Sequence, residues 1–170
     1  MSRCCKEGSD NKVKPLSTHL RGKLEKIEQI LECLIQESSS GVPIVVEGDN
    51  DFQTLRHLGV QGTIVCAKTG GKSVLDLLSQ IEDGGFKEAT LLFDFDRRGK
   101  ELTRIVMENL EKVHVKLDLT FWSQLLALVG REVKDIEGLD AYLVTLRKKT
   151  GQAPLRHWEG FEKIFTVRKA

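Results

Sequence analysis

The apolar positions of this chain change from a helical spacing to a strand spacing near residue 40. Between Leu16 and Ile35, apolar side chains recur at steps of three and four residues, which predicts one long amphipathic helix. A polar SSSG segment at 38–41 ends that pattern. Beyond it, short apolar runs predict strands, and the first three runs are nearly continuous, as in a parallel sheet covered on both faces. These runs lie at 43–47, 63–67, 89–93 and 114–119.

Helical spacing returns between these runs, at 51–58, 73–81 and 100–110. A strand, helix, strand, helix order is typical of right-handed βαβ crossovers. The predicted fold is therefore α/β: a Rossmann-like parallel sheet of about four strands flanked by helices, with an extra N-terminal helix. Two further helices are expected at 121–129 and 139–148.

One folded domain is expected, at residues 16–150, because single domains most often have about 100–150 residues. Residues 1–15 contain too few apolar side chains to be ordered by burial, so they are predicted to form a flexible N-terminal tail. The C-terminal extension at 151–170 is predicted to pack on the core through its aromatic side chains, which are Trp158, Phe161 and Phe165.

Composition narrows the class of protein. The chain is 40% apolar and 30% charged, and no apolar run approaches the roughly 18 residues that a membrane span requires. The first residues also lack the apolar segment of a signal peptide. A cytoplasmic protein without a membrane partner is predicted. The net charge of +1 does not by itself indicate a nucleic-acid partner, so binding of RNA or DNA must depend on a local patch.

Acidic residues follow two of the predicted strands, at the edge where open α/β sheets bind ligands. Glu47 ends the first strand, and Asp94 and Asp96 follow the third. Side chains two residues apart on an extended chain point the same way, so both aspartates can approach one or two ions. Ligands that are all oxygen suit Mg²⁺, with Mn²⁺ as a substitute, better than Zn²⁺.

Each of these two corners, where a predicted strand turns into the next helix, also has an ordinary structural interpretation. Asp51 is expected to cap the following helix or to brace the site, and Gly48 to allow a sharp turn. Asp96 can equally cap a helix that begins near Arg98. Glu47 is harder to explain in this way, because a carboxylate that ends a buried strand is costly to desolvate without a cation or several donors.

The paired motif resembles the Toprim domain: Glu-Gly ends one strand in VVEGDND, and Asp-x-Asp-x-x-Gly ends a later one in LLFDFDRRG. The resemblance covers residues 42–120 and is closest to small stand-alone Toprim proteins, many of them archaeal. The family includes the catalytic domains of type IA topoisomerases, bacterial primases and the ribonuclease that matures 5S ribosomal RNA. The resemblance implies Mg²⁺ ligands at Asp94 and Asp96, a general acid/base or metal ligand at Glu47, and a bracing glycine at Gly99.

Two features depart from the topoisomerase pattern. Lys100 follows Gly99 where topoisomerases often have a glutamate, and the acidic residue, Glu101, comes one place later. The chain is also too short for strand-gating domains, and its only tyrosine, Tyr142, lies in a predicted amphipathic helix where packing is the ordinary role. Topoisomerase activity is therefore not expected.

Basic residues surround the predicted metal site. Arg97 and Arg98 follow the second aspartate, and Lys68 and Lys72 flank the corner after the second strand. A solvated charged surface explains any one of them. As a group they are candidates to hold phosphate oxygens, which would make nucleic-acid binding strongly dependent on salt.

The corner after the second strand, AKTGGKSVLDLL, partly matches a nucleotide-binding P-loop. Cys66 stands where that motif requires its first glycine, so the match is incomplete. The favoured interpretation is a tight turn at Gly70 and Gly71, with Ser73 capping the next helix beside the metal site.

The leading hypothesis is a Mg²⁺-dependent nuclease or phosphotransfer enzyme acting on RNA or DNA, in which the ions polarise the phosphoryl group and Glu47 exchanges protons. An alternative from another class is a non-catalytic, metal-dependent nucleic-acid-binding module within a larger complex with a protein partner. A P-loop-like nucleotide hydrolase is less favoured. A plain α/β scaffold with capped helices is the remaining interpretation.

Overall fold

The computed structural model describes residues 15–71 and 73–153 of the 170-residue chain. The predicted tail, apart from Pro15, lies outside the described residues, as do Lys72 and the aromatic side chains predicted to pack from the C-terminal extension. None of the helices in the described part combines the length and apolar character needed to cross a bilayer.

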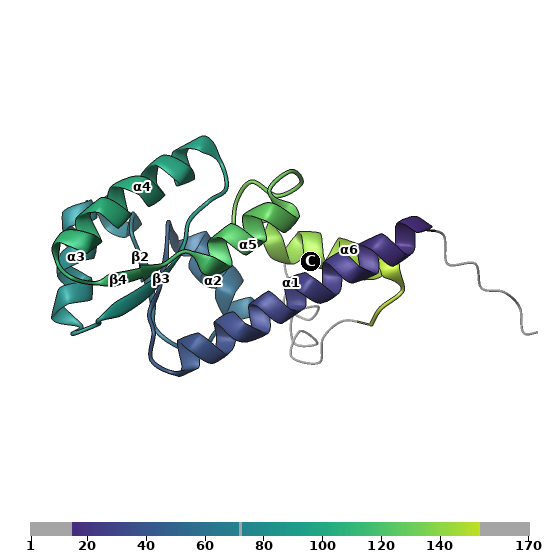
Figure 1. Cartoon of the computed structure of the whole chain (residues 1–170), viewed down its shortest axis with the longest axis horizontal. Coiled ribbons are helices and arrows are strands. Elements are labelled where there is room, and N and C mark those ends of the chain that lie inside the picture. Colours follow the sequence, from purple (N-terminus) through teal and green to yellow (C-terminus); the bar gives the residue numbers. More distant parts are fainter. Residues whose placement is uncertain (1–14, 72, 154–170) are drawn as a thin grey trace, which may run out of the picture.

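Helices and strands alternate along the described chain, as the apolar pattern predicts (Figure 1). In chain order they are α1 (Pro15–Ser39), β1 (Ile44–Val46), α2 (Asp49–His57), β2 (Ile64–Cys66), the short 3-10 turn η1 (Thr69–Gly71), α3 (Val74–Asp83), β3 (Glu88–Leu92), α4 (Arg97–Lys112), β4 (Lys116–Asp118), α5 (Thr120–Val129) and α6 (Leu139–Thr150).

The four strands form one sheet in the order β2-β1-β3-β4, and every neighbouring pair is parallel. Val45 of the central strand β1 lies opposite Val65 of β2 on one side and Leu91 of β3 on the other. The predicted α/β fold with a parallel sheet of four strands is confirmed. Because the strands are parallel and in register, their carboxyl ends meet at one edge of the sheet.

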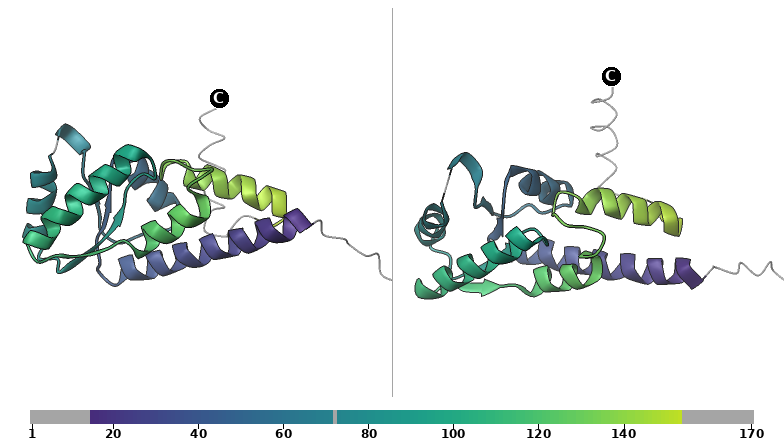
Figure 2. Two further views of the ribbon diagram at one scale, coloured as in Figure 1. Left: turned by 45° about the horizontal axis from the view of Figure 1, so that its top comes forward. Right: turned by 90° about the horizontal axis from the view of Figure 1, so that it is seen from above.

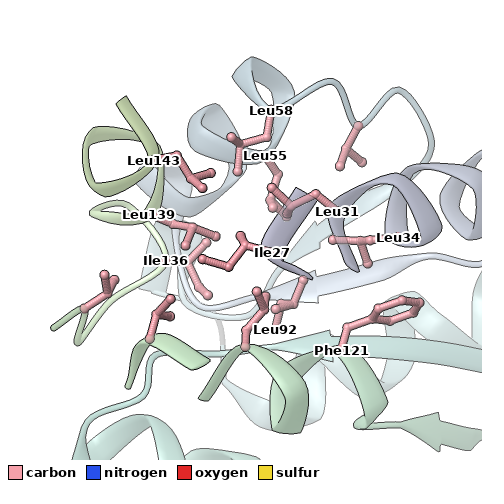
Figure 3. Close-up of a cluster of buried hydrophobic side chains, with 14 of the residues drawn as sticks. Ile27, Leu31, Leu34, Leu55, Leu58, Leu92, Phe121, Ile136, Leu139 and Leu143 are labelled. Atoms are coloured by element: carbon pink, nitrogen blue, oxygen red, sulfur yellow. The ribbon is translucent and has the colours of Figure 1, made fainter. Parts of the chain in front are cut away.

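Side chains that alternate along the strands build a core on each face of the sheet. Val45 and Leu91 face a layer made by α3 and α4, where they pack with Leu77, Ile81 and Val106. The other face carries Ile44, Val46 and Leu92, which pack under α1, α2, α5 and α6. Figure 3 shows this second cluster, in which Ile27, Leu31 and Leu34 of α1 gather with Leu55, Phe121, Ile136 and Leu139 from the surrounding elements.

The N-terminal helix α1 is part of this core. Its apolar side chains at Leu24, Ile27 and Leu34 are fully buried, at 0% exposure. Beyond the sheet, α1 lies beside α6 in both views of Figure 2, and the Arg147 guanidinium of α6 forms an ion pair with Glu28 of α1. The half-buried ring of Tyr142 packs against the same cluster, which is the packing role expected of it. Helix α1 therefore covers the sheet.

Replacing Ile27 by alanine tests whether α1 belongs to the core in solution. The change should lower the free energy of unfolding by about 2–5 kcal/mol, because it removes a fully buried branched side chain and leaves a cavity. Urea denaturation followed by circular dichroism measures it. Glu25→Ala, at an exposed position of the same helix, is the matched control and should change stability by less than about 0.5 kcal/mol. Equal, small effects would mean that α1 does not pack on the sheet.

Candidate functional site

Glu47 follows β1 directly and lies at the sheet edge where the strand ends meet. Its side chain is 15% exposed, and its Oε1 atom forms an ion pair with the Lys68 ammonium group. The other oxygen, Oε2, is buried and has no hydrogen-bond partner within residues 15–71 and 73–153. A buried carboxylate oxygen without a donor is costly, so this atom is an acceptor to which a cation or a donor from a ligand can bind.

Asp51 braces the corner that holds Glu47. Its Oδ2 atom accepts a hydrogen bond from the Gly48 backbone N–H at 3.0 Å, and the residue is only 6% exposed. Burial, together with the neighbouring Glu47 and Glu137 charges, raises the pKa of Asp51 to about 6, against the opposing effect of the bond from Gly48. The backbone of Gly48 is extended, with φ −149° and ψ −174°, and a Cβ there would meet nothing within 4 Å. Other residues could adopt this backbone conformation, so the prediction that the turn requires glycine at position 48 is wrong.

Asp94 follows β3 and turns toward Glu47 and Asp51. Its Oδ1 atom accepts a hydrogen bond from the Ile136 N–H at 3.1 Å. Burial, together with the charges of Asp51, Glu47 and Asp135, raises the pKa of Asp94 to about 7, against the opposing effect of the bond from Ile136. The Asp94 carboxyl group thus lies among other acids without enough donors to offset their charge.

Asp96 is used differently from Asp94. It is exposed and forms the N-cap of α4, where its Oδ1 atom accepts a bond from the Gly99 N–H at 2.7 Å. This cap starts α4 at Arg97, three residues before the predicted position of 100. Gly99 is buried against the preceding corner, and a Cβ there would lie 2.1 Å from the Asp94 carbonyl oxygen. Only glycine allows this helix to pack so closely on the strand end.

The carboxylates gather around one open depression of about 450 Å³, which we call the acidic hollow. Six of its eight lining residues are acidic, and Asp96 is not among them; the lining consists of Glu47, Gly48, Asp49, Asn50, Asp51, Asp94, Asp135 and Glu137. The concentration of like charge, relieved by few donors, favours a cation in this hollow.

Sequence reasoning missed Asp135 and Glu137, which come from the connection between α5 and α6. Asp135 Oδ1 accepts a bond from the Gly138 N–H at 2.8 Å, and Glu137 Oε2 accepts one from the Asn50 side-chain amide at 2.7 Å. Their spacing in KDIEG repeats the acid-x-acid pattern of Asp94 and Asp96, which was the available signal. No strand precedes them, so the sheet-edge argument did not reach them.

A second depression, the basic hollow, has a volume of about 520 Å³. It brings together three of the four predicted phosphate-binding residues, and its lining is Lys68, Arg97, Arg98, Glu101, Leu102 and Ile105. Arg97 and Arg98 occupy the first turn of α4, which contains no acidic residue. Cations are unfavourable at this positive end of a helix, so their position is not explained by helix stability.

The nearby Arg104 is held within α4 and is a poor candidate for phosphate. Its guanidinium group bonds to Glu101 and Glu108, each at 2.6 Å, and both ion pairs are exposed. Arg97 and Arg98, by contrast, line the basic hollow. The structure therefore separates the arginines of this helix into a pair that faces the hollow and one that is paired along the helix surface.

The corner after β2 contains the predicted tight turn and cap. Gly70 and Gly71 have positive φ angles of 67° and 75°, which glycine adopts without strain. Ser73 caps α3: its Oγ accepts a bond from the Asp76 N–H at 3.4 Å, and its own N–H donates to Asp76 Oδ2 at 2.6 Å. Both features favoured over a P-loop for this corner are confirmed.

The donor chemistry of the acidic hollow fits a hard divalent cation, because every candidate ligand is an oxygen. The unpartnered Glu47 Oε2 and the raised pKa of Asp94 both indicate carboxyl groups that positive charge would stabilise. Within residues 15–71 and 73–153, however, no three His, Cys, Asp or Glu side chains are already arranged to hold one ion.

The Asp94→Asn change should increase stability at neutral and alkaline pH. The folded pKa of about 7 lies above the ordinary value of 3.8, so the native protein binds more protons than the unfolded chain between about pH 4 and 7, and its stability falls as pH rises through that range. Asparagine keeps the acceptor for the Ile136 N–H but carries no charge. We expect a gain of about 1–3 kcal/mol at pH 8, less than the full shift because the group is partly solvated.

Urea denaturation at pH 4, 6 and 8 measures this effect, and the gain should nearly vanish at pH 4. Glu111→Gln, at an exposed position of α4, is the control and should have a small effect at every pH. A loss of stability in Asp94→Asn at pH 8 would show that the carboxylate is favourably paired in the native protein.

Comparison with known proteins places the chain in a family. No family model matches the sequence. A UPF0292 protein from Methanosarcina acetivorans is 34% identical over 131 residues, which are 77% of this chain and 89% of the relative. One from Methanocaldococcus jannaschii is 34% identical over 120 residues, 70% of this chain and 91% of the relative. A solved structure from Aquifex aeolicus matches with a TM-score of 0.55 and 26% identity, covering 64% of this chain and 94% of its own. This chain belongs to the UPF0292 family.

Proposed function

We propose that this protein is a Mg²⁺-dependent, Toprim-type protein that acts on the phosphodiester bonds of RNA or DNA, as a nuclease or phosphotransfer enzyme. One observation carries the proposal: the acidic hollow and the basic hollow are connected at the carboxyl edge of the sheet by the Lys68 to Glu47 ion pair. A nucleic-acid backbone needs both parts, because its phosphates require cationic side chains and the chemistry at phosphorus requires a metal.

In this proposal Glu47 and Asp94 are the principal ligands of the metal. Asp96 uses Oδ1 for the helix cap, so it would contribute its second oxygen. When bound, Mg²⁺ would polarise a phosphoryl oxygen and offset the negative charge that develops during transfer. Mn²⁺ would substitute, since both ions accept oxygen ligands. Asp51 and Gly99 would keep the two strand ends in place around the ion.

The basic hollow supplies the phosphate contacts. Arg97 and Arg98 would hold backbone oxygens next to the metal, with Lys68 at the boundary between the two hollows. Glu47 would also be positioned to accept or return a proton at the reacting oxygen, since its Oε2 atom has no hydrogen-bond partner among the described residues. In this proposal the arginines bind the nucleic-acid backbone, and the acids hold the metal that the cleavage step requires.

A non-catalytic nucleic-acid-binding module is the second candidate. The observation that favours it is the absence, among the described residues, of three side chains already arranged for one ion, together with the use of Asp96 as a cap. In such a protein the metal would bridge backbone phosphates to the acids without cleavage. The two candidates share the same binding surface and differ in turnover.

Calorimetric titration with Mg²⁺ and Mn²⁺ tests the shared part of the proposal. The native chain should bind at least one ion with saturation, and Asp94→Asn and Glu47→Gln should each weaken that binding by tenfold or more, because each removes a charged ligand from a small set. Glu111→Gln should leave it unchanged, since this acid lies outside the hollow. An absence of saturable binding in the native chain would refute the proposal.

Turnover is then measured with end-labelled single-stranded and duplex RNA and DNA. Metal-dependent cleavage that disappears in Glu47→Gln is the result expected of the enzyme. Binding that needs the metal but produces no cleavage would assign the protein to the non-catalytic class.

A further inference from the structure

Lys68 lines the basic hollow and pairs with Glu47, a residue of the acidic hollow. It follows β2 at the sheet edge, and its backbone N–H donates to the Glu47 carbonyl oxygen at 2.9 Å, so the two residues lie side by side on neighbouring strands. Its ammonium group contacts Glu47 Oε1, whereas its side chain also lines the basic hollow beside Arg97 and Arg98. One cation is therefore shared between the acid that faces the metal position and the arginines that face the phosphate position.

The two partners of this ion pair differ in their freedom to move. The Lys68 side chain is 40% exposed and has a long flexible stem, whereas the Glu47 side chain is 15% exposed and directly follows a buried strand. Ion pairs with a solvated lysine are weak, because the lysine can exchange its partner for water at little cost. When the pair opens, Lys68 is the residue that moves, and Glu47 remains at the edge of the acidic hollow.

We propose that Lys68 couples the binding of metal to the binding of nucleic acid. Lys68 pairs with Glu47 and so competes with a divalent cation for that carboxylate. When a backbone phosphate enters the basic hollow, the Lys68 ammonium group leaves Glu47 and forms an ion pair with the phosphate. The Glu47 carboxylate is then available to the cation. This inference rests on the proposed function, and it adds how the site is regulated: each ligand makes the site more favourable for the other.

Charge balance supports this exchange. With Lys68 on Glu47, the basic hollow has lost part of its positive charge to the acidic hollow. A divalent cation at Glu47 would replace the Lys68 ammonium group, which could then turn to the basic hollow, where Arg97 and Arg98 already lie. By thermodynamic linkage, a phosphate that draws Lys68 away must raise the affinity for the cation by the same factor that the cation raises the affinity for the phosphate.

Calorimetry with Mn²⁺, with and without a short single-stranded phosphorothioate oligonucleotide that resists cleavage, tests the coupling. In the native chain the oligonucleotide should tighten Mn²⁺ binding by about two- to fivefold, the size expected of one half-exposed ion pair. Lys68→Met should bind Mn²⁺ by a similar factor more tightly than the native chain when no oligonucleotide is present, and the oligonucleotide should then tighten Mn²⁺ binding by a smaller factor than it does in the native chain. Titrations of Mn²⁺ into the oligonucleotide alone provide the baseline.

Lys100→Met is the matched control, because it removes the same charge from the exposed start of α4 outside the acidic hollow. It should keep the coupling. If Lys68→Met leaves the Mn²⁺ affinity and the coupling unchanged while Asp94→Asn abolishes Mn²⁺ binding, the role of Lys68 is refuted and the proposed function stands. If the native chain binds no Mn²⁺, both fail.

A second measurement uses the unmodified protein and does not depend on a variant that folds. The rate at which acetic anhydride modifies each lysine is followed by mass spectrometry, with and without Mn²⁺. Mn²⁺ should raise the rate at Lys68 relative to Lys100 by about two- to fivefold, because it releases the ammonium group from Glu47. An unchanged ratio at saturating Mn²⁺ would overturn the exchange.

Discussion

The parallel register of β1 with both of its neighbours is the constraint on which the candidate site depends. Val45 lies opposite Val65 and Leu91, so the residues that follow the three strands reach the same edge together. This alignment brings Glu47 beside Lys68 through the bond between their backbones and turns Asp94 toward the same hollow. A slip of one residue in either pair would reverse the faces of the strand and separate these side chains.

The edge of the sheet concentrates charge at a cost to stability. Burial and neighbouring acids raise the pKa of Asp51 and of Asp94, and two arginines occupy the positive end of α4. Cations at the positive end of a helix and buried acids close to other acids are both unfavourable, whereas the two apolar cores follow the expected packing. Conflicts of this kind gather at sites that bind ligands, since a ligand of the missing charge relieves them.

The apolar pattern was sufficient to predict the four parallel strands and the helices between them, because a covered parallel sheet requires continuous apolar runs. The same logic placed Glu47 and Asp94 at one edge. It could not separate Asp94 from Asp96, since only the backbone path decides which of two neighbouring acids caps α4. Asp135 and Glu137 could not be predicted as site residues, because tertiary packing rather than a strand end places the connection before α6 at the hollow. Ile136, between these two acids, is buried in the core.

The central claim is that a divalent cation binds at the acidic hollow. Paramagnetic broadening by Mn²⁺ in a ¹H–¹⁵N correlation spectrum tests it directly, because broadening falls steeply with distance from the ion. With the ion in the acidic hollow, the amides of Gly48 and Ile136, which bond to Asp51 and Asp94, should broaden at the lowest Mn²⁺ concentration. Broadening centred on another part of the surface, with these two amides unaffected, would contradict it.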